Sequence, residues 1–289
     1  VADFDQNGLP DLFFTGNMVE NKLYLNQGNF KFTDITETAG VGALGKWSYG
    51  SSVVDINGDG LLDIYVCSSI SADPEERKNM LFVNQGPNAD GIPVFQDEAG
   101  SYGLDLDNHN THASFFDFDQ DGDLDVYVLA NLRIEGIPTT YQKKVTDGSS
   151  PNNDHLYRNN GDGTFTEVTL EAGITTEGFG LGVATADLNK DGATDIYVSN
   201  DFLTNDLLYL NQNGQFTEQI DDAMKHQSRF AMGNDAADIN NDGELDIITL
   251  DMQPETNLRK KTVMIPSGYI VYINDNRYGY THQYVRNML

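Results

Sequence analysis

Aspartate and asparagine residues recur along the chain at a spacing that suits the binding of a hard metal ion. One nine-residue pattern occurs five times, with Asp or Asn at positions one, three, five and nine and Gly at position six. The copies are DFDQNGLPD at 3–11, DINGDGLLD at 55–63, DFDQDGDLD at 117–125, DLNKDGATD at 187–195 and DINNDGELD at 238–246. Oxygen ligands at alternate positions of a tight loop can turn toward one point, and Gly permits the bend.

The predicted ligands of each loop are these four side chains and the backbone carbonyl of position seven. In chain order the ligand sets are Asp3, Asp5, Asn7, Leu9, Asp11; Asp55, Asn57, Asp59, Leu61, Asp63; Asp117, Asp119, Asp121, Asp123, Asp125; Asp187, Asn189, Asp191, Ala193, Asp195; and Asp238, Asn240, Asp242, Glu244, Asp246. Flexible, all-oxygen ligation suits Ca²⁺ better than Mg²⁺, which wants a stricter octahedron, or Zn²⁺, which wants His or Cys. We therefore expect up to five calcium ions, mainly structural, each tying two strands together.

Two alternatives to this interpretation can be weighed on the residues. An EF-hand places a bidentate Glu at position twelve, at the start of a helix. Position twelve here falls in apolar or β-branched runs and holds Phe14, Val66, Val128, Val198 and Thr249. The EF-hand interpretation therefore fails. A metal-free Asp/Gly turn is common for a single copy, but clustered carboxylates in five copies would repel one another without a cation.

The elements around the loops are predicted to be short strands. Each loop is followed by an apolar or β-branched run, such as IYV at 64–66, and preceded by a small-residue stretch ending in an apolar pair, such as GSSVVD at 50–55. Most repeats then carry an Asn/Gly turn between apolar-aromatic arms, as in LLYLNQNGQF from Leu207, which is a strong hairpin signal. One repeat therefore contains four strands, with the aspartate loop between the first and the second.

These repeats predict an all-β fold, a β-propeller of four-stranded blades. The loops start 52, 62, 70 and 51 residues apart, which matches a propeller blade better than the shorter rungs of a β-solenoid, the alternative. We expect a single domain over 1–289 with repeats near 1–44, 45–106, 107–176, 177–226 and 227–289. The first and last repeats are expected to be incomplete, because Val1 and Ala2 end a first strand and RNML at 286–289 matches KNML at 78–81, where a third strand starts.

Composition limits the partners. The 289 residues hold 45 Asp and Glu against 17 Lys and Arg, a formal charge of -28, so nucleic acid and anionic membranes would be repelled. A hydrophobic fraction of 39% with 15 Phe and 14 Tyr favours a packed core over disorder. Cys67 is the only cysteine, so no internal disulfide is possible. No apolar run approaches the ~18 residues that a membrane span needs.

The recurring pattern D-x-[DN]-x-[DN]-G-x-x-D, with the NxLYxNxGxxF hairpin, resembles the FG-GAP and VCBS-type repeats of the integrin α-subunit propeller and of many bacterial surface proteins. The fifth repeat, MGNDAADINNDGELDIITLDMQPETN, is similar to a bacterial secreted variety related to cartilage acidic protein. The resemblance implies a calcium-binding propeller, often seven-bladed, of a class used in cell adhesion. It does not carry over an integrin-like ligand.

The irregular segments predict where a partner binds. They join second to third strands near 15–20, 68–78, 130–154, 199–206 and 250–285, at the opposite end of the strands from the aspartate loops. Near the first-strand starts at that end lie the candidate partner-binding residues Trp47, Tyr49, His109, His112, Phe179, Arg229 and Phe230. The alternative is that these side chains pack between blades.

The leading functional hypothesis is an extracellular or cell-surface binding and scaffold module, secreted or on a bacterial outer membrane, for a protein or carbohydrate partner. It could form part of a larger surface complex. Loops of modest affinity fill only at the ~0.1–1 mM calcium found outside cells. The alternative is a carbohydrate-active enzyme resembling propeller polysaccharide lyases, with His109 and His112 available for acid–base work. A convergent His/Tyr/Arg group in a basic cleft would favour the enzyme.

Overall fold

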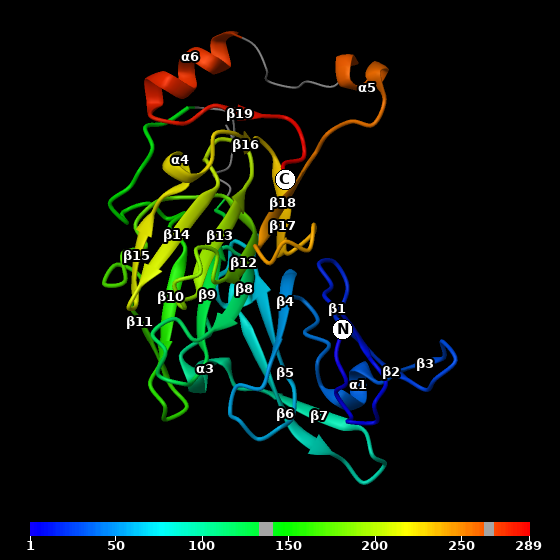
Figure 1. Cartoon of the computed structure of the whole chain (residues 1–289). Helices are drawn as coiled ribbons and strands as arrows, with labels where there is room; N and C mark the ends of the chain where they lie inside the picture. The colour runs from blue at the N-terminus through cyan, green and yellow to red at the C-terminus, as the bar shows by residue number, and fades with distance from the viewer. Residues whose placement is uncertain (133–140, 263–268) are drawn as a thin grey trace. The chain divides into compact units, whose positions relative to one another are not determined.

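The computed structural model describes residues 1–132, 141–262 and 269–289 (Figure 1). Their contacts separate into two units, which we describe one at a time: Val1–Phe115 with Arg158–Thr166, and Phe116–Tyr157 with Glu167–Leu289. The described residues form an all-β structure of antiparallel sheets with short helices, as the sequence predicts. The expectation of a single domain stays a prediction.

A complete four-stranded sheet lies within the first unit. Its strands follow the chain in the order β4 Ser48–Val54, β5 Asp63–Ser68, β6 Met80–Pro87 and β7 Pro93–Asp97. All six residues of β5 are buried, which explains why this strand is a continuous apolar run instead of alternating with polar residues. The predicted order of strand, aspartate loop, strand, irregular loop, strand, turn, strand is therefore confirmed for the second repeat.

The first repeat forms a three-stranded sheet in the same unit. It contains β1 Leu12–Phe14, β2 Lys22–Asn26 and β3 Phe32–Asp34, all antiparallel. Ala2 forms an antiparallel bridge with Asp11, in the position that Val54 and Asp63 occupy in the second repeat. Ala2 therefore pairs in the register that the last residue of a first strand has in the second repeat.

The second unit also contains a complete four-stranded sheet. Its strands are β12 Gly180–Ala186, β13 Asp195–Asn200, β14 Leu207–Gln212 and β15 Gln215–Glu218. The turn between β14 and β15 consists of Asn213 and Gly214, with φ of 55° and 81°. Positive φ at both central residues is the type I′ geometry that an Asn-Gly pair favours, so the hairpin prediction is confirmed here.

The third repeat, which the unit boundary crosses, supplies β8 Asn110–Phe116, β9 Asp125–Ala130, β10 His155–Asn159 and β11 Phe165–Glu167. Within the second unit β9 and β10 pair antiparallel, with Tyr127 opposite Leu156. The fifth repeat supplies the antiparallel pair β17 Ala231–Ala237 and β18 Asp246–Asp251. A short parallel pair, β16 Gln227–Ser228 and β19 Gln283–Tyr284, lies in the same unit.

The helices are short connectors. They are α1 Thr36–Ala39, α2 Pro74–Arg77, α3 Ala99–Tyr102, α4 Ile220–Ala223, α5 Asn257–Thr262 and α6 Tyr269–Tyr278. Three of them, α1, α3 and α4, follow the last strand of a repeat. The first two end at Gly40 and Gly103, whose φ of 80° and 74° explains the Gly-containing links of the sequence. Among the described residues no helix has the length and apolar character needed to cross a membrane.

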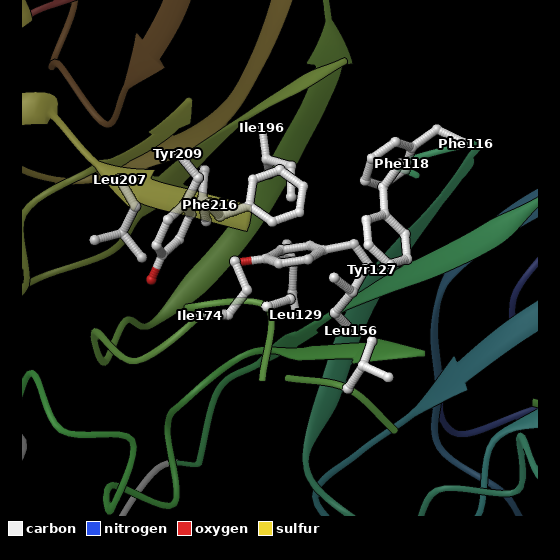
Figure 2. Packing of buried hydrophobic residues seen from close by; sticks show 13 residues of the cluster. Phe116, Phe118, Tyr127, Leu129, Leu156, Ile174, Ile196, Leu207, Tyr209 and Phe216 are labelled. Carbon is white, nitrogen blue, oxygen red and sulfur yellow. The ribbon is translucent and has the colours of Figure 1, made fainter. Parts of the chain in front are cut away.

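Each unit has its own apolar core. In the first unit Phe4, Leu23, Ile64 and Phe95 pack together from loop, strand and hairpin residues. In the second unit the cluster of Figure 2 brings Tyr127 together with Phe118 and Phe216, whose ring centroids lie 6.0 Å apart. The cores gather side chains from more than one repeat, so neighbouring repeats stabilise each other by burying apolar area.

First strands of neighbouring repeats approach each other closely within each unit. In the first unit the Ser52 hydroxyl of β4 donates to the carbonyl of Ala113 in β8 at 2.6 Å. A Cβ atom at Gly50 would come within 2.5 Å of β8 backbone. In the second unit Asn234 of β17 donates to the carbonyl of Gly182 in β12 at 3.1 Å. A Cβ at Gly182 would come within 2.9 Å of β17. Close approach therefore explains the small residues before the aspartate loops.

A carboxyl or amide side chain fastens the end of each second strand to the start of the third. In every repeat a backbone N–H at the end of the second strand donates to the Oδ1 atom of this Asn or Asp side chain at 2.7–2.9 Å. The accepting residues are Asn21, Asn79, Asp154, Asp206 and Asn287. Thr249 and Met288 also exchange backbone hydrogen bonds, so RNML occupies the predicted third-strand position of the fifth repeat.

Replacing Asp206 by Asn should flatten the pH dependence of stability. Burial raises the pKa of Asp206 to about 7, opposed by hydrogen bonds from Asn200 and Tyr197. Because its folded pKa exceeds its unfolded value of 3.8, the folded state binds more protons, and stability falls as pH rises through about 7. We expect the unfolding free energy, measured by urea titration in chelator, to rise by on the order of 4 kcal/mol from pH 8 to pH 4 relative to D206N.

Asn79 holds the equivalent place with an amide, its Oδ1 accepting from Ser68 N–H at 2.9 Å, so the fold accommodates Asn there. Asp73→Asn, at the N-cap of α2, serves as the surface control. Equal pH profiles for wild type and D206N would contradict a buried titrating carboxyl at this position.

Candidate metal centres in the aspartate loops

The carboxylate at position one organises every aspartate loop. Its two oxygens accept from the N–H of position five at 3.0–3.2 Å and from the N–H of the position-six glycine at 2.8–3.1 Å. The side chain at position five accepts in turn from the N–H of position seven at 2.8–3.1 Å. These bonds hold the loop in the curved conformation that the sequence predicts.

The carboxylate at position nine stands where the second strand begins, and it is buried in the first four loops and half-buried at Asp246 in the fifth. Asp11, Asp63, Asp125 and Asp195 are all 0% exposed. In every loop its Oδ2 accepts the N–H of position two at 2.9–3.1 Å. An ionised carboxylate offers about four lone-pair sites, so these bonds leave capacity for bidentate binding of a metal ion.

The electrostatics of position nine favour a nearby cation. Burial raises the pKa of Asp63 to about 6, an effect that hydrogen bonds from Asn84 and Ile56 oppose and the charges of Asp59 and Asp55 increase. Burial likewise raises the pKa of Asp11 and Asp195. A positive charge between these carboxylates would stabilise their ionised forms.

In two of the five loops the structure brings three carboxylates of the predicted ligand set close together. In the first loop Asp3, Asp5 and Asp11 each offer an oxygen within 4.8 Å of the others, and the third loop does the same with Asp117, Asp119 and Asp125. The donors are all oxygen, the chemistry that Ca²⁺ prefers. Position twelve lies in a strand in each repeat, so the loops are not EF-hands. The residues fit a calcium ion.

An asparagine in the third strand, which the sequence analysis did not single out, completes the surroundings of position nine. The backbone N–H groups of Asn26, Asn84 and Asn211 donate to Oδ1 of the position-nine Asp at 2.7–2.8 Å. Their side chains donate to the position-eight carbonyl of the same loop at 2.9–3.3 Å. The signal was present in the sequence, because each Asn ends a run such as LYLN or LFVN.

The candidate partner-binding residues of the first unit are half-buried. Trp47, Tyr49, His109 and His112 all have intermediate exposure. Nδ1 of His109 lies 3.2 Å from the backbone nitrogen of Ile70, and burial, with a smaller effect of Arg77, lowers the His109 pKa. Burial lowers the pKa of His112 as well. Both imidazoles therefore favour the neutral form.

In the second unit the candidate partner-binding residues are less accessible. Phe179 is half-buried, whereas Arg229 is 3% and Phe230 8% exposed. Arg229 Nη2 donates to the Tyr141 hydroxyl at 2.8 Å, and that hydroxyl donates to Asp275 at 2.9 Å. Arg229 Nη1 lies 3.5 Å from Asp275. Residues of the third and fifth irregular segments therefore cover Arg229.

The repeat pattern is also recognised by a family model. The model described as FG-GAP-like repeat matches residues 3–66, 145–198 and 189–249, which together exceed half of the chain. The chain belongs to the FG-GAP-like repeat family. Each FG-GAP-like segment contains at least one aspartate loop and at least the first residues of the strand that follows it, so the predicted resemblance to FG-GAP repeats is confirmed. The third loop lies outside the matched segments and is assigned from its own residues. No curated protein matches the chain.

Replacing Asn211 by Ala should destabilise the second unit. The Asn211 side chain is 0% exposed, donates to the carbonyls of Phe118 and Thr194 at 2.8 and 3.1 Å, and accepts from Gly214 N–H at 2.9 Å. Truncation leaves these buried groups unpaired, at a cost of about 2–3 kcal/mol. Urea denaturation followed by circular dichroism measures this loss.

Asn257→Ala, at an exposed position in α5, is the matched control and should change stability by less than about 0.5 kcal/mol. Equal losses in the two variants would refute the structural role assigned to Asn211.

Proposed function

We propose that this chain is a calcium-stabilised, extracellular binding and scaffold module built as a β-propeller. The observation that carries the proposal is the separation of two ends in every repeat. One end holds the aspartate loops, with the same hydrogen bonds in all five copies. The other end joins second to third strands through segments of different length and structure, including α2, α5 and α6.

The propeller arrangement is supported by the position of the first strands. In a propeller the first strand of each blade lies nearest the central axis, beside the first strands of the neighbouring blades. The close approach of β4 to β8 and of β12 to β17 is what that geometry requires. Family membership adds support, because the resemblance to FG-GAP repeats implies a propeller.

The calcium proposal follows from the donor chemistry of the loops. Bound calcium would be held by the side chains of positions one, three, five and nine and the carbonyl of position seven. It would supply the charge that offsets clustered, partly buried carboxylates, and it would link first and second strands. Millimolar calcium is found outside cells, which supports an extracellular location.

The binding face is proposed at the ends of the strands opposite the aspartate loops. Half-buried Trp47 and Tyr49 stand there with part of their aromatic surface accessible, and aromatic side chains are effective anchors for proteins and sugars. Irregular loops on a rigid frame suit recognition, because they can vary without disturbing the core.

Catalysis on a carbohydrate is the second candidate, and one group bears on it. Arg229, Tyr141 and His282 converge on Asp275, with His282 Nδ1 3.7 Å from its carboxylate. Such a group is the kind of constellation that an enzyme could use. However, Arg229 and Asp275 are each 3% exposed and neutralise each other. This burial favours a structural role for the group, and we therefore propose binding over catalysis.

Calcium should raise the thermal stability of the intact chain. A ligand present at 100 times its dissociation constant stabilises by about 2.7 kcal/mol per site, so melting in 5 mM calcium should occur well above melting in EDTA, by roughly that free energy for each loop filled. Asp59→Ala should lose part of this increment, whereas Asp90→Ala, an exposed acid outside the loops, should keep it. Superimposable melting curves in calcium and EDTA would sink the calcium proposal.

Replacing Trp47 and Tyr49 together by Ala should weaken recognition without abolishing calcium binding. We expect an immobilised panel of extracellular-matrix proteins and polysaccharides to retain the wild-type chain and at least tenfold less of the double variant. Phe14→Ala/Phe30→Ala, two exposed aromatic residues of the first repeat, is the control. Reducing-end release or chain cleavage on the same polysaccharides would support the enzyme instead, and equal retention of both variants would place recognition elsewhere.

A further inference from the structure

We propose that the side chain at position four of an aspartate loop is a positioning residue for the next loop along the chain, and couples metal binding between them. The residues concerned are Gln6, Gln120 and Lys190. This inference rests on the proposed calcium function and adds a specific property to it. Loops one and two form one coupled block, and loops three, four and five form another.

Position four has a left-handed backbone conformation that aims its side chain out of the loop. The φ angles are 58° at Gln6, 61° at Gln120 and 61° at Lys190. This region is unfavourable for residues with a Cβ atom and favours Gly. Gly58 holds the same position in the second loop with φ of 71°, so the loop geometry itself accepts glycine. Retaining a long side chain there calls for a compensating contact.

The contact is made with the following loop in both units. In the first unit Gln6 Nε2 donates to the carbonyl of Gly60 at 2.8 Å. In the second unit Gln120 Nε2 donates to the carbonyl of Gly192 at 2.7 Å. The position is the same in both cases: position four of one loop reaches position six of the next. Lys190 makes the third link as an ion pair with Glu244 at 2.6 Å.

The peptide group whose carbonyl accepts this bond also donates its N–H to the side chain of a predicted metal ligand. The carbonyl of Gly192 and the N–H of Ala193 belong to one peptide unit, and that N–H donates to Asp191 Oδ1 at 2.9 Å. In the first unit the N–H of Leu61 donates to Asp59 Oδ1 at 2.8 Å in the same way. Gln120 and Gln6 therefore fix peptides that orient the position-five carboxylates of the next loop.

The donating end is equally close to its own site. Gln120 lies between the predicted ligands Asp119 and Asp121, so a cation that orders these side chains also orders the backbone from which Gln120 projects. Filling loop three then lowers the ordering cost of loop four, and by linkage filling loop four favours loop three to the same degree. Because the Gln120 bond is exposed to solvent, we expect a modest coupling, two- to fivefold in affinity.

Asn211 also joins these two loops, through the carbonyls of Phe118 and Thr194. Any coupling through Asn211 is present whether or not Gln120 is replaced. The contribution of position four is therefore obtained from the difference between the wild-type chain and the Gln120→Gly variant. This substitution introduces the residue type that the second loop already carries at its position four.

The test is a calcium titration of the full chain labelled with ¹⁵N-glycine. The amides of Gly122 and Gly192 donate to Asp117 and Asp187, so each reports the state of its own loop. Asp119→Ala disables loop three. In the wild-type background this change should raise the calcium midpoint of Gly192 two- to fivefold. In the Gln120→Gly background the fold increase should be smaller than the wild-type increase by a factor of at least two. Gln215→Ala is the control, because it changes an exposed glutamine of β15 outside the aspartate loops, leaves the Gln120 contact in place and should keep the full effect.

The outcomes separate the two proposals. Glycine amides that ignore calcium in all loops would refute both the calcium function and the coupling. Amides that titrate normally, with the same Asp119→Ala effect in the wild-type and Gln120→Gly backgrounds, would leave the calcium function standing and overturn the role of position four. Loss of the effect in Gln215→Ala as well would also overturn it, because a general loosening of the second unit would then explain the result.

Discussion

The structure depends on the buried carboxylate at position nine of the aspartate loops, where the second strand begins. Asp11, Asp63 and Asp195 have no exposure, and each receives one N–H from its own loop and one from the third strand. Moving an anion out of water is costly, and these hydrogen bonds offset only part of the cost, since burial still raises the pKa of all three groups. The carboxylate therefore connects the loop, the second strand and the third strand, and moving any one of them would break a buried hydrogen bond to it. A cation in the loop would remove the remaining penalty, which connects the packing of the sheet to the proposed chemistry of the site.

At the opposite end of the second strand a buried side-chain oxygen again accepts a backbone N–H, but there an amide replaces the carboxylate in some repeats. Asn79 in one repeat and Asp206 in another accept the N–H at the strand's end, and Tyr65 and Tyr197 place their hydroxyls against these side chains. Between the two fastened ends the strand is buried along its whole length, so its residues can be apolar on both faces. The IYV runs are thus a consequence of hydrogen bonding at both ends of the strand as well as of burial in the middle.

The sequence predicts the parts of this structure whose causes are local. An aspartate loop closes on itself within nine residues, and an Asn-Gly turn sets its own φ angles, so both could be placed from residue types and spacing. The role of Asn211 was missed because its partners, Phe118 and Thr194, are distant in sequence, although the recurring Asn was visible. Arg229 is the harder case. Its place near a strand start suggested an accessible rim, but Tyr141 and Asp275 arrive from separate irregular segments, and no local pattern predicts such a meeting.

This difference in range explains why the two ends of each repeat differ so much. The bonds that shape an aspartate loop span two to seven residues, apart from those to the third strand, so a copy of the loop folds in the same way wherever the chain repeats it. At the other end the segments make contacts with residues that are distant in sequence, as Arg229 does with Asp275, and these contacts differ from one repeat to the next. A surface that recognises a partner must vary along its length, whereas a repeated structural framework requires the same contacts in every repeat. The position-four side chains stand between these cases, because they are part of a repeated loop yet make their contact with the next one.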